Sequence, residues 1–198
     1  MKISFPKFVV FLNSLIPLAL LAWDLYRKQV GPNPVEFVTR TTGMLTLVFL
    51  CLTVAVTPLR RIFGINSLVK FRRILGLFAF FYGSLHLLTY IWFDRLWNLA
   101  GVAADVVQRP FILAGMTAFL LMVPLAITST NKMVKRIGGK RWAKLHRLVY
   151  LAAIAGVVHF WMLVKSDYSL PLTFGFIILF LLGYRLLVKY FPSDVPIS

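Results

Sequence analysis

Six long apolar runs, separated by short polar connections, constrain this chain more than any other feature of its sequence. They cover approximately residues 8–23, 42–57, 74–93, 111–127, 148–164 and 170–188. A helix needs roughly 17–25 apolar residues to cross the hydrocarbon core of a bilayer, whereas barrel strands are shorter and alternate in polarity. The runs therefore predict an all-α integral membrane protein with six transmembrane helices.

The composition leaves little chain for a soluble domain. Of the 198 residues, 60% are hydrophobic and only 14% are charged, which is typical of membrane proteins rather than of soluble globular domains. No internal repeat or low-complexity segment interrupts the runs. We therefore expect residues 1–198 to form a single transmembrane domain.

The basic residues are distributed unevenly between the two sides of the predicted membrane. Of the 22 Lys and Arg residues, 16 lie in the N-terminal tail, the second and fourth connections and the C-terminal end, and five of the six acidic residues lie on the opposite side. Cytoplasmic loops carry the excess of Lys and Arg in membrane proteins. The net charge of +16 thus indicates topology rather than nucleic-acid binding, and both termini are predicted to be cytoplasmic.

Two of the three histidines are predicted to lie at the same depth in the membrane. With a rise of ~1.5 Å per residue, His86 lies about 20 Å from Arg73 at the inner boundary, and His159 lies about 9 Å from Lys165 at the outer one. In a core about 30 Å thick both fall in the outer half. Ionisable residues inside a bilayer usually mark a functional site, and two level imidazoles suit the axial positions of a low-spin haem b.

Small residues accompany both histidines, and they admit two interpretations. In the third run, Ala79 and Gly83 lie on the same helix face as His86, on the turns before it. In the fifth run, Ala152, Ala155 and Gly156 lie in the same way relative to His159. They either leave room for a flat macrocycle or let the helices pack closely.

Other chemistries find less support in the sequence. Buried zinc usually recruits a third or fourth ligand, the acidic residues lie outside the apolar runs, and the single cysteine, Cys51, lies inside the second run. A self-contained nicotinamide-driven reductase would need a dinucleotide-binding domain, for which no segment is long enough. A stand-alone ferric or metal reductase, and a non-haem transporter or structural membrane protein, remain the alternatives to a haem electron conduit.

Several stretches closely resemble one known family. They are "GPNPVEF" (31–37), "TPLRR" (57–61), "FRRILGLFAFFYGSLHLLTYIW" (71–92) and "WAKLHRLVYLAAIAGVVHFW" (142–161). The chain resembles, over nearly its whole length, the MsrQ (YedZ) family, the haem-binding membrane subunits of the bacterial protein-methionine-sulfoxide reductase system MsrPQ, related to the ferric-reductase transmembrane domains.

The resemblance implies an electron-transfer subunit in the bacterial inner membrane rather than a catalytic subunit. It would take electrons from the quinone pool or a cytoplasmic flavin reductase and pass them to a periplasmic molybdopterin partner, MsrP, in a heterodimer. That partner reduces methionine sulfoxide in oxidised envelope proteins, which restores an apolar side chain.

The resemblance also implies cofactors and the residues that bind them. By position, the haem histidines are His86, His159 and His146, and the family is also associated with flavin mononucleotide (FMN). A flavin phosphate would find donors among Arg72, Arg73, Lys140 and Arg141, although topology anchoring alone would explain these residues equally well.

His146 is predicted to differ in role from the other two histidines. The wider ferric-reductase pattern places a second histidine about 14 residues before His86, but Arg72 stands there, and a guanidinium cannot ligate iron. His146, with Arg72 and Trp142 nearby, would therefore hold an inner haem with a non-histidine second ligand, form part of a flavin site, or lie at the interface. A helix turns by 1300° over thirteen residues, so His146 and His159 share one face only if the helix bends.

Overall fold

The computed structural model describes residues 4–190, and this part of the chain is helical without strands. Residues 1–3 and 191–198, which the single-domain prediction includes, lie outside the described residues. The helical elements are α1 (Phe5–Tyr26), α2 (Pro34–Phe63), η1 (Asn66–Lys70), α3 (Arg72–Thr89), the π-helical η2 (Tyr90–Asp94), α4 (Leu99–Gln108), α5 (Pro110–Ile127), α6 (Asn131–Ile137), α7 (Gly139–Leu145), α8 (Leu148–Leu163) and α9 (Ser169–Tyr190).

Six of these segments are long and apolar enough to cross a membrane, which confirms the predicted fold class. They are α1, α2, α3 with η2, α5, α7 with α8, and α9. The second segment extends well beyond the predicted 42–57. Its N-terminus is capped by Asn33, whose side chain accepts from the Glu36 N–H at 3.2 Å, and it ends at Gly64 with a φ of 67°. A left-handed residue at that position terminates a helix, and glycine adopts it without steric cost.

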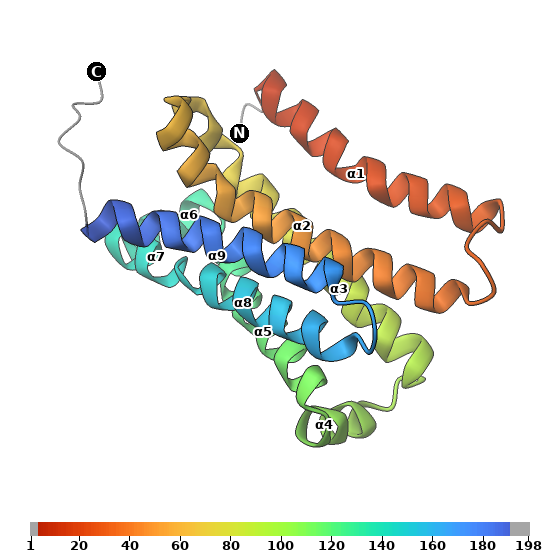
Figure 1. Ribbon diagram of the computed structural model, residues 1–198. Coiled ribbons are helices and arrows are strands. Elements are labelled where there is room, and N and C mark those ends of the chain that lie inside the picture. The colour runs from red at the N-terminus through yellow and green to blue at the C-terminus, as the bar shows by residue number, and fades with distance from the viewer. Residues whose placement is uncertain (1–3, 191–198) are drawn as a thin grey trace.

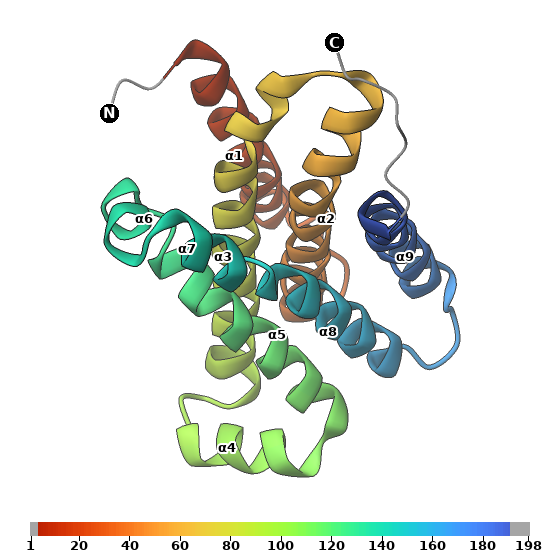
Figure 2. The same ribbon diagram turned by 90° about the vertical axis from the view of Figure 1, so that its left-hand side faces the viewer.

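Four helices form a closed ring, and the remaining two long helices flank it. Helix α2 packs along α3 and α5 packs along α8, while α2 also contacts α8 and α3 also contacts α5. Helices α3 and α8 therefore lie diagonally opposite each other. Helix α9 packs against α2 and α8, and α1 lies at the edge of the bundle (Figures 1 and 2).

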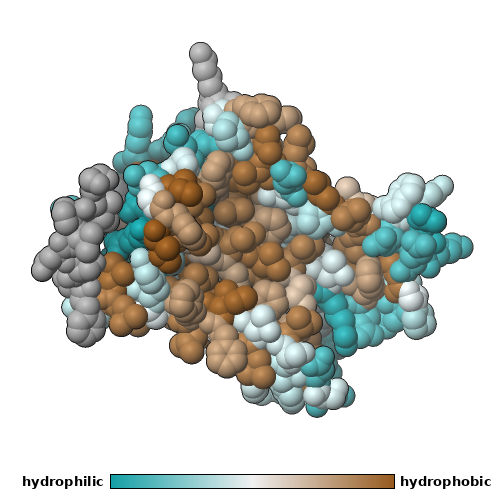
Figure 3. All heavy atoms as spheres, turned by 45° about the horizontal axis from the view of Figure 1, so that its top comes forward, coloured by the Kyte–Doolittle hydropathy of each residue, from teal (hydrophilic) through white to brown (hydrophobic). Residues whose placement is uncertain are grey.

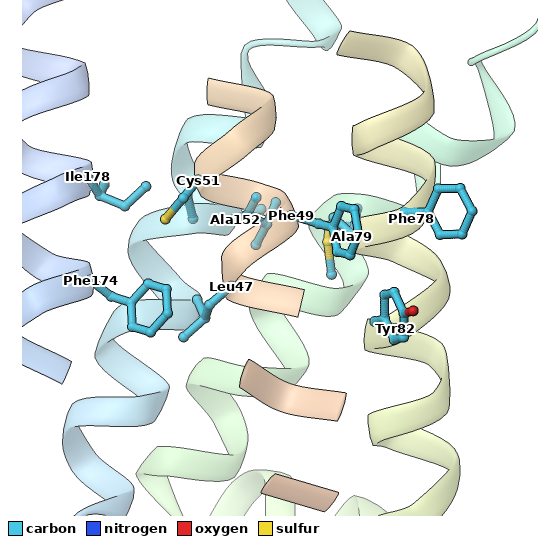
Figure 4. Packing of buried hydrophobic residues seen from close by; sticks show 12 residues of the cluster. Leu47, Phe49, Cys51, Phe78, Ala79, Tyr82, Ala152, Phe174 and Ile178 are labelled. Atoms are coloured by element: carbon cyan, nitrogen blue, oxygen red, sulfur yellow. The ribbon is translucent and has the colours of Figure 1, made fainter. Parts of the chain in front are cut away.

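Apolar side chains form the outer surface of the bundle as well as its core. Large apolar side chains of α9, such as those of Leu179 and Phe180, are 67% and 66% exposed, as expected for a surface that faces lipid. Figure 3 shows apolar residues across the middle of one face and hydrophilic residues gathered toward the ends. In the core, Phe49 stacks on Tyr82, with ring centroids 5.3 Å apart (Figure 4).

The connection between α3 and α5 contains a short helix, α4, that the sequence analysis did not predict. Asp105 of α4 is buried, accepts a hydrogen bond from the Tyr90 hydroxyl and pairs with the guanidinium groups of Arg95 and Arg109. The Tyr90 hydroxyl and, beyond it, these two cations hold the pKa of the Asp105 carboxyl below its usual range. This ion cluster ties η2 to α4 at one end of the bundle, which we call the α4 end; the opposite end is the α7 end.

Candidate functional site

His86 of α3 and His159 of α8 meet across the centre of the four-helix ring. Their ring centroids are 6.0 Å apart and their planes are inclined by 75°. Two imidazoles that bind one metal ion from opposite sides, each through a bond of about 2 Å, also have centroids about 6 Å apart. The pair therefore has the separation that two axial ligands of a single metal require.

Each of these imidazoles is fixed by a backbone carbonyl of a neighbouring helix. His86 Nδ1 lies 2.9 Å from the Thr39 carbonyl oxygen, and His159 Nδ1 lies 2.6 Å from that of Phe111. A carbonyl only accepts hydrogen bonds, so both Nδ1 atoms carry the proton and both Nε2 atoms keep a lone pair. Metal-binding histidines are held in this way, and so the donor set fits a bis-imidazole haem.

The small residues beside the histidines pack against neighbouring side chains, as the close-packing interpretation predicts. A Cβ atom on Gly156 would lie 3.0 Å from Leu47 Cδ2, and one on Gly83 would lie 3.1 Å from Met122 Cε. Ala79 and Ala152 are fully buried within the apolar core (Figure 4). These residues bring α3 and α8 close to α2 and α5.

His146 lies at a break in the fifth membrane segment. Helix α7 ends at Leu145 and α8 begins at Leu148. His146 Nε2 lies 3.0 Å from Thr128 Oγ1 just beyond the end of α5, while His159 contacts Phe111 near its beginning. Because the helix breaks here, both histidines contact α5. In an unbroken helix, thirteen residues would place them on different faces.

Thr128 and Trp142 hold the His146 ring. The Thr128 hydroxyl donates to the Pro124 carbonyl at 2.6 Å, so it accepts from His146 Nε2–H. The Trp142 indole N–H donates to the Thr128 carbonyl at 2.9 Å, and its ring stacks on His146 with centroids 3.8 Å apart. The free ring nitrogen of His146 is Nδ1, whereas that of His86 and His159 is Nε2.

A cavity of about 340 Å³ adjoins His146 at the α7 end of the bundle. Its lining contains no Asp or Glu among the residues that the structure describes, but it includes Trp142 together with four arginines, namely Arg72, Arg73, Arg147 and Arg185. Such a basic, aromatic cavity suits an anionic, planar group.

Two of the four proposed phosphate donors do not belong to this cavity. Lys140 and Arg141 are exposed on α7 and do not line it, whereas Arg72 and Arg73 do. Arg72 is the first residue of α3 rather than part of a loop. Lys140 and Arg141 lie outside the cavity, on the exposed surface of the short helix α7. Basic residues that lie close together in the sequence are therefore not all close to the cavity.

Sequence reasoning missed Arg185, which approaches the cavity from α9. Its guanidinium donates to the Tyr150 hydroxyl and, at 2.6 Å, to the Val54 carbonyl. Its Nε is buried and has no hydrogen-bond partner among the described residues. Thr39, Gly43, Phe111 and Gly115, which surround the histidine pair, were missed as well, because a backbone carbonyl and a glycine carry no chemical signal in the sequence.

Other metal-binding clusters do not occur in the described part of the chain. Within residues 4–190 no group of three or more His, Cys, Asp or Glu side chains comes together. Cys51 of α2 is a free cysteine that is buried in the apolar core of the bundle. The histidine pair and the cavity beside His146 are the candidate sites in the described part of the chain.

The fold and the paired histidines define a helical membrane protein of the ferric-reductase type, and comparison with known proteins agrees. The family described as "Ferric reductase like transmembrane component" matches residues 40–157. A relative from Herminiimonas arsenicoxydans is 50% identical over 186 residues, which cover 93% of this chain and 85% of the relative. Relatives from Azospira oryzae and Ralstonia nicotianae are each 47% identical, over 95% and 90% of this chain and 81% and 83% of their own lengths.

All three relatives are named protein-methionine-sulfoxide reductase heme-binding subunit MsrQ. This chain belongs to the MsrQ family, and it is a multi-pass membrane protein.

Proposed function

We propose that this chain binds haem b between His86 and His159 and conducts electrons through the membrane to a methionine-sulfoxide reductase. The proposal is supported above all by the two imidazoles, 6.0 Å apart, whose Nδ1 atoms are both engaged and whose Nε2 atoms both keep a lone pair. The relatives' name, heme-binding subunit, agrees with it. A bound haem supplies a one-electron ferric/ferrous couple, which the protein tunes through its axial ligands and their hydrogen bonds.

The cavity beside His146 is the proposed site of electron input. Its four arginines suit the phosphate of FMN or the carboxylates of a second haem, and Trp142 supplies an aromatic face for either ring system. The Thr128 hydroxyl holds the His146 ring through Nε2, so a second haem would use Nδ1 or require that bond to break. This difference favours FMN as the occupant of the cavity.

The direction of transfer follows from the charge distribution. The α7 end carries most of the Lys and Arg residues and is therefore proposed to face the cytoplasm, with both termini, in the bacterial inner membrane. The histidine pair lies toward the α4 end, on the periplasmic side in this topology. Residues 1–198 would form one domain.

The donor and the acceptor of the electrons lie on opposite sides of the membrane in this proposal. A quinol of the membrane pool or a cytoplasmic flavin reductase supplies two electrons through the cavity. The chain delivers them, one at a time, to a periplasmic molybdopterin subunit, MsrP, bound as a heterodimer. There two electrons and two protons convert methionine sulfoxide to methionine and water, so the chain itself is an electron-transfer subunit and not the catalytic one.

Optical spectroscopy of the detergent-purified protein tests the haem assignment. We expect a Soret band with the features of low-spin haem, and we expect either His86→Ala or His159→Ala to abolish the low-spin signal because each removes one axial ligand. Leu151→Ala, on the exposed face of α8, is the matched control. Wild-type spectra in both histidine variants, or a colourless wild-type protein, would refute the proposal and favour a non-haem membrane protein.

A further inference from the structure

Each histidine of the central pair rests against a glycine of a neighbouring helix. A Cβ atom on Gly43 of α2 would lie 3.0 Å from both Cε1 and Nδ1 of His86, and one on Gly115 of α5 would lie 2.8 Å from Nδ1 of His159. These separations are shorter than ordinary carbon contacts of about 3.5–4.0 Å. Neither position can therefore hold a larger residue unless the imidazole moves.

The same two helices supply the carbonyls that hold the imidazoles, and the spacing is identical. The Thr39 carbonyl precedes Gly43 by four residues, and the Phe111 carbonyl precedes Gly115 by four residues. A side chain on a helix leans toward the N-terminus and covers the preceding turn. Any side chain at position 43 or 115 would thus lie over the carbonyl that its histidine uses, and glycine leaves that carbonyl open.

We call each combination of a carbonyl and the glycine four residues later a carbonyl–glycine seat. The seat on α2 holds the histidine of α3, and the seat on α5 holds the histidine of α8. Glycines on the histidine helices themselves behave differently, because Gly83 and Gly156 would contact the aliphatic ends of Met122 and Leu47. Contact with an imidazole is therefore not a general property of the glycines in this bundle.

We propose that Gly43 and Gly115 are positioning residues that set the tautomer, the place and the plane of the two axial imidazoles. This inference rests on the proposed haem function. The open carbonyl keeps the proton on Nδ1, so that the Nε2 lone pair would be available to a haem iron, and the missing side chain lets the ring lie flat against the supporting helix. The two seats together produce the 75° angle between the ring planes.

The proposal predicts a change in redox behaviour rather than in folding alone. A hydrogen bond from Nδ1–H to a carbonyl makes the imidazole a more basic ligand, and a more basic ligand stabilises ferric over ferrous iron. A side chain that displaces the ring weakens this bond. The midpoint potential of the haem should then move to more positive values.

The experiment compares Gly43→Ala and Gly115→Ala with two glycine controls. Gly175→Ala would place a Cβ 3.7 Å from Val157 Cγ1, an ordinary contact, and Gly183→Ala would meet nothing within 4 Å. We expect the haem dissociation constant, measured by titrating apoprotein with haem, to rise about 10–100-fold in the seat variants, together with a positive shift of the midpoint potential. The controls should match the wild type in both measurements.

The outcomes separate this inference from the function on which it rests. If the seat variants match the controls while His86→Ala and His159→Ala lose the haem, the seats are refuted and the haem function stands. If the histidine variants keep a wild-type haem, the function itself is wrong.

A measurement on the wild-type protein tests the seats without depending on the folding of any variant. Imidazole planes that cross at a steep angle give low-spin ferric haem a strongly anisotropic electron paramagnetic resonance signal, whereas parallel planes give a rhombic one. The 75° angle predicts the anisotropic signal. A rhombic signal from the wild-type protein would overturn the inference, whether or not Gly43→Ala and Gly115→Ala fold.

Discussion

Replacing His146 by alanine should weaken the α7 end of the bundle and slow electron input, while leaving the central haem intact. The imidazole is stacked on Trp142, with centroids 3.8 Å apart, and bonded to Thr128 at 3.0 Å. It makes no contact with the His86–His159 pair, because thirteen helical residues correspond to about 20 Å. The low-spin spectrum of the central haem should therefore not change.

The size of the stability loss follows from the two interactions that disappear. An aromatic pair contributes about 0.5–1.5 kcal/mol, and a hydrogen bond between membrane helices contributes about 0.6 kcal/mol, at most about 1.7 kcal/mol. Their sum is about 1–3 kcal/mol. For a protein of this length each kcal/mol lowers the melting temperature by about 2–4 °C.

Thermal unfolding in detergent and stopped-flow reduction of the haem measure the two effects. The variant should melt lower than both the wild type and Leu151→Ala, a lipid-facing change on the same segment. Its haem should be reduced more slowly by a quinol analogue or a reduced flavin, but at the wild-type rate by dithionite, which reacts directly. An unchanged melting temperature together with an unchanged rate would show that His146 is an interface residue without a role in electron input.

Two further predictions test the packing and the ion cluster of the fold. Gly156→Leu should lower the melting temperature, because even a Cβ atom at position 156 would lie only 3.0 Å from Leu47 Cδ2. Such overpacking costs about 1–3 kcal/mol. Variant apoprotein as stable as the wild-type apoprotein would contradict this prediction. Asp105→Asn should destabilise the protein at pH 7, because Tyr90 and Arg95 stabilise the ionised carboxyl and lower its pKa. This stabilisation is fully present above the pKa of about 3.9 that the Asp105 carboxyl has in the unfolded chain. It is lost as the pH falls through the lower pKa of the folded state. The melting temperatures of the variant and the wild type should therefore converge only below about pH 4.

Local sequence patterns were sufficient for the membrane fold. Apolar runs of spanning length predict helices because each backbone N–H and C=O must be paired within its own segment inside a bilayer. The same patterns made His86 and His159 candidates for a site, because an ionisable group in an apolar run is costly unless it serves one. The additional helix α4 was missed because its ten residues are too few to span a bilayer.

The surroundings of the histidines depend on how the helices meet. The apolar runs alone do not determine that α2 lies beside α3 and α5 beside α8, so Thr39, Gly43, Phe111 and Gly115 became recognisable only when the ring was assembled. Arg185 reaches the cavity from a helix that is distant in the sequence. A sequence determines which residues are apolar, charged or able to ligate because these properties belong to single side chains. Distances, uncovered carbonyls and ring angles arise between helices, and only the tertiary structure decides them.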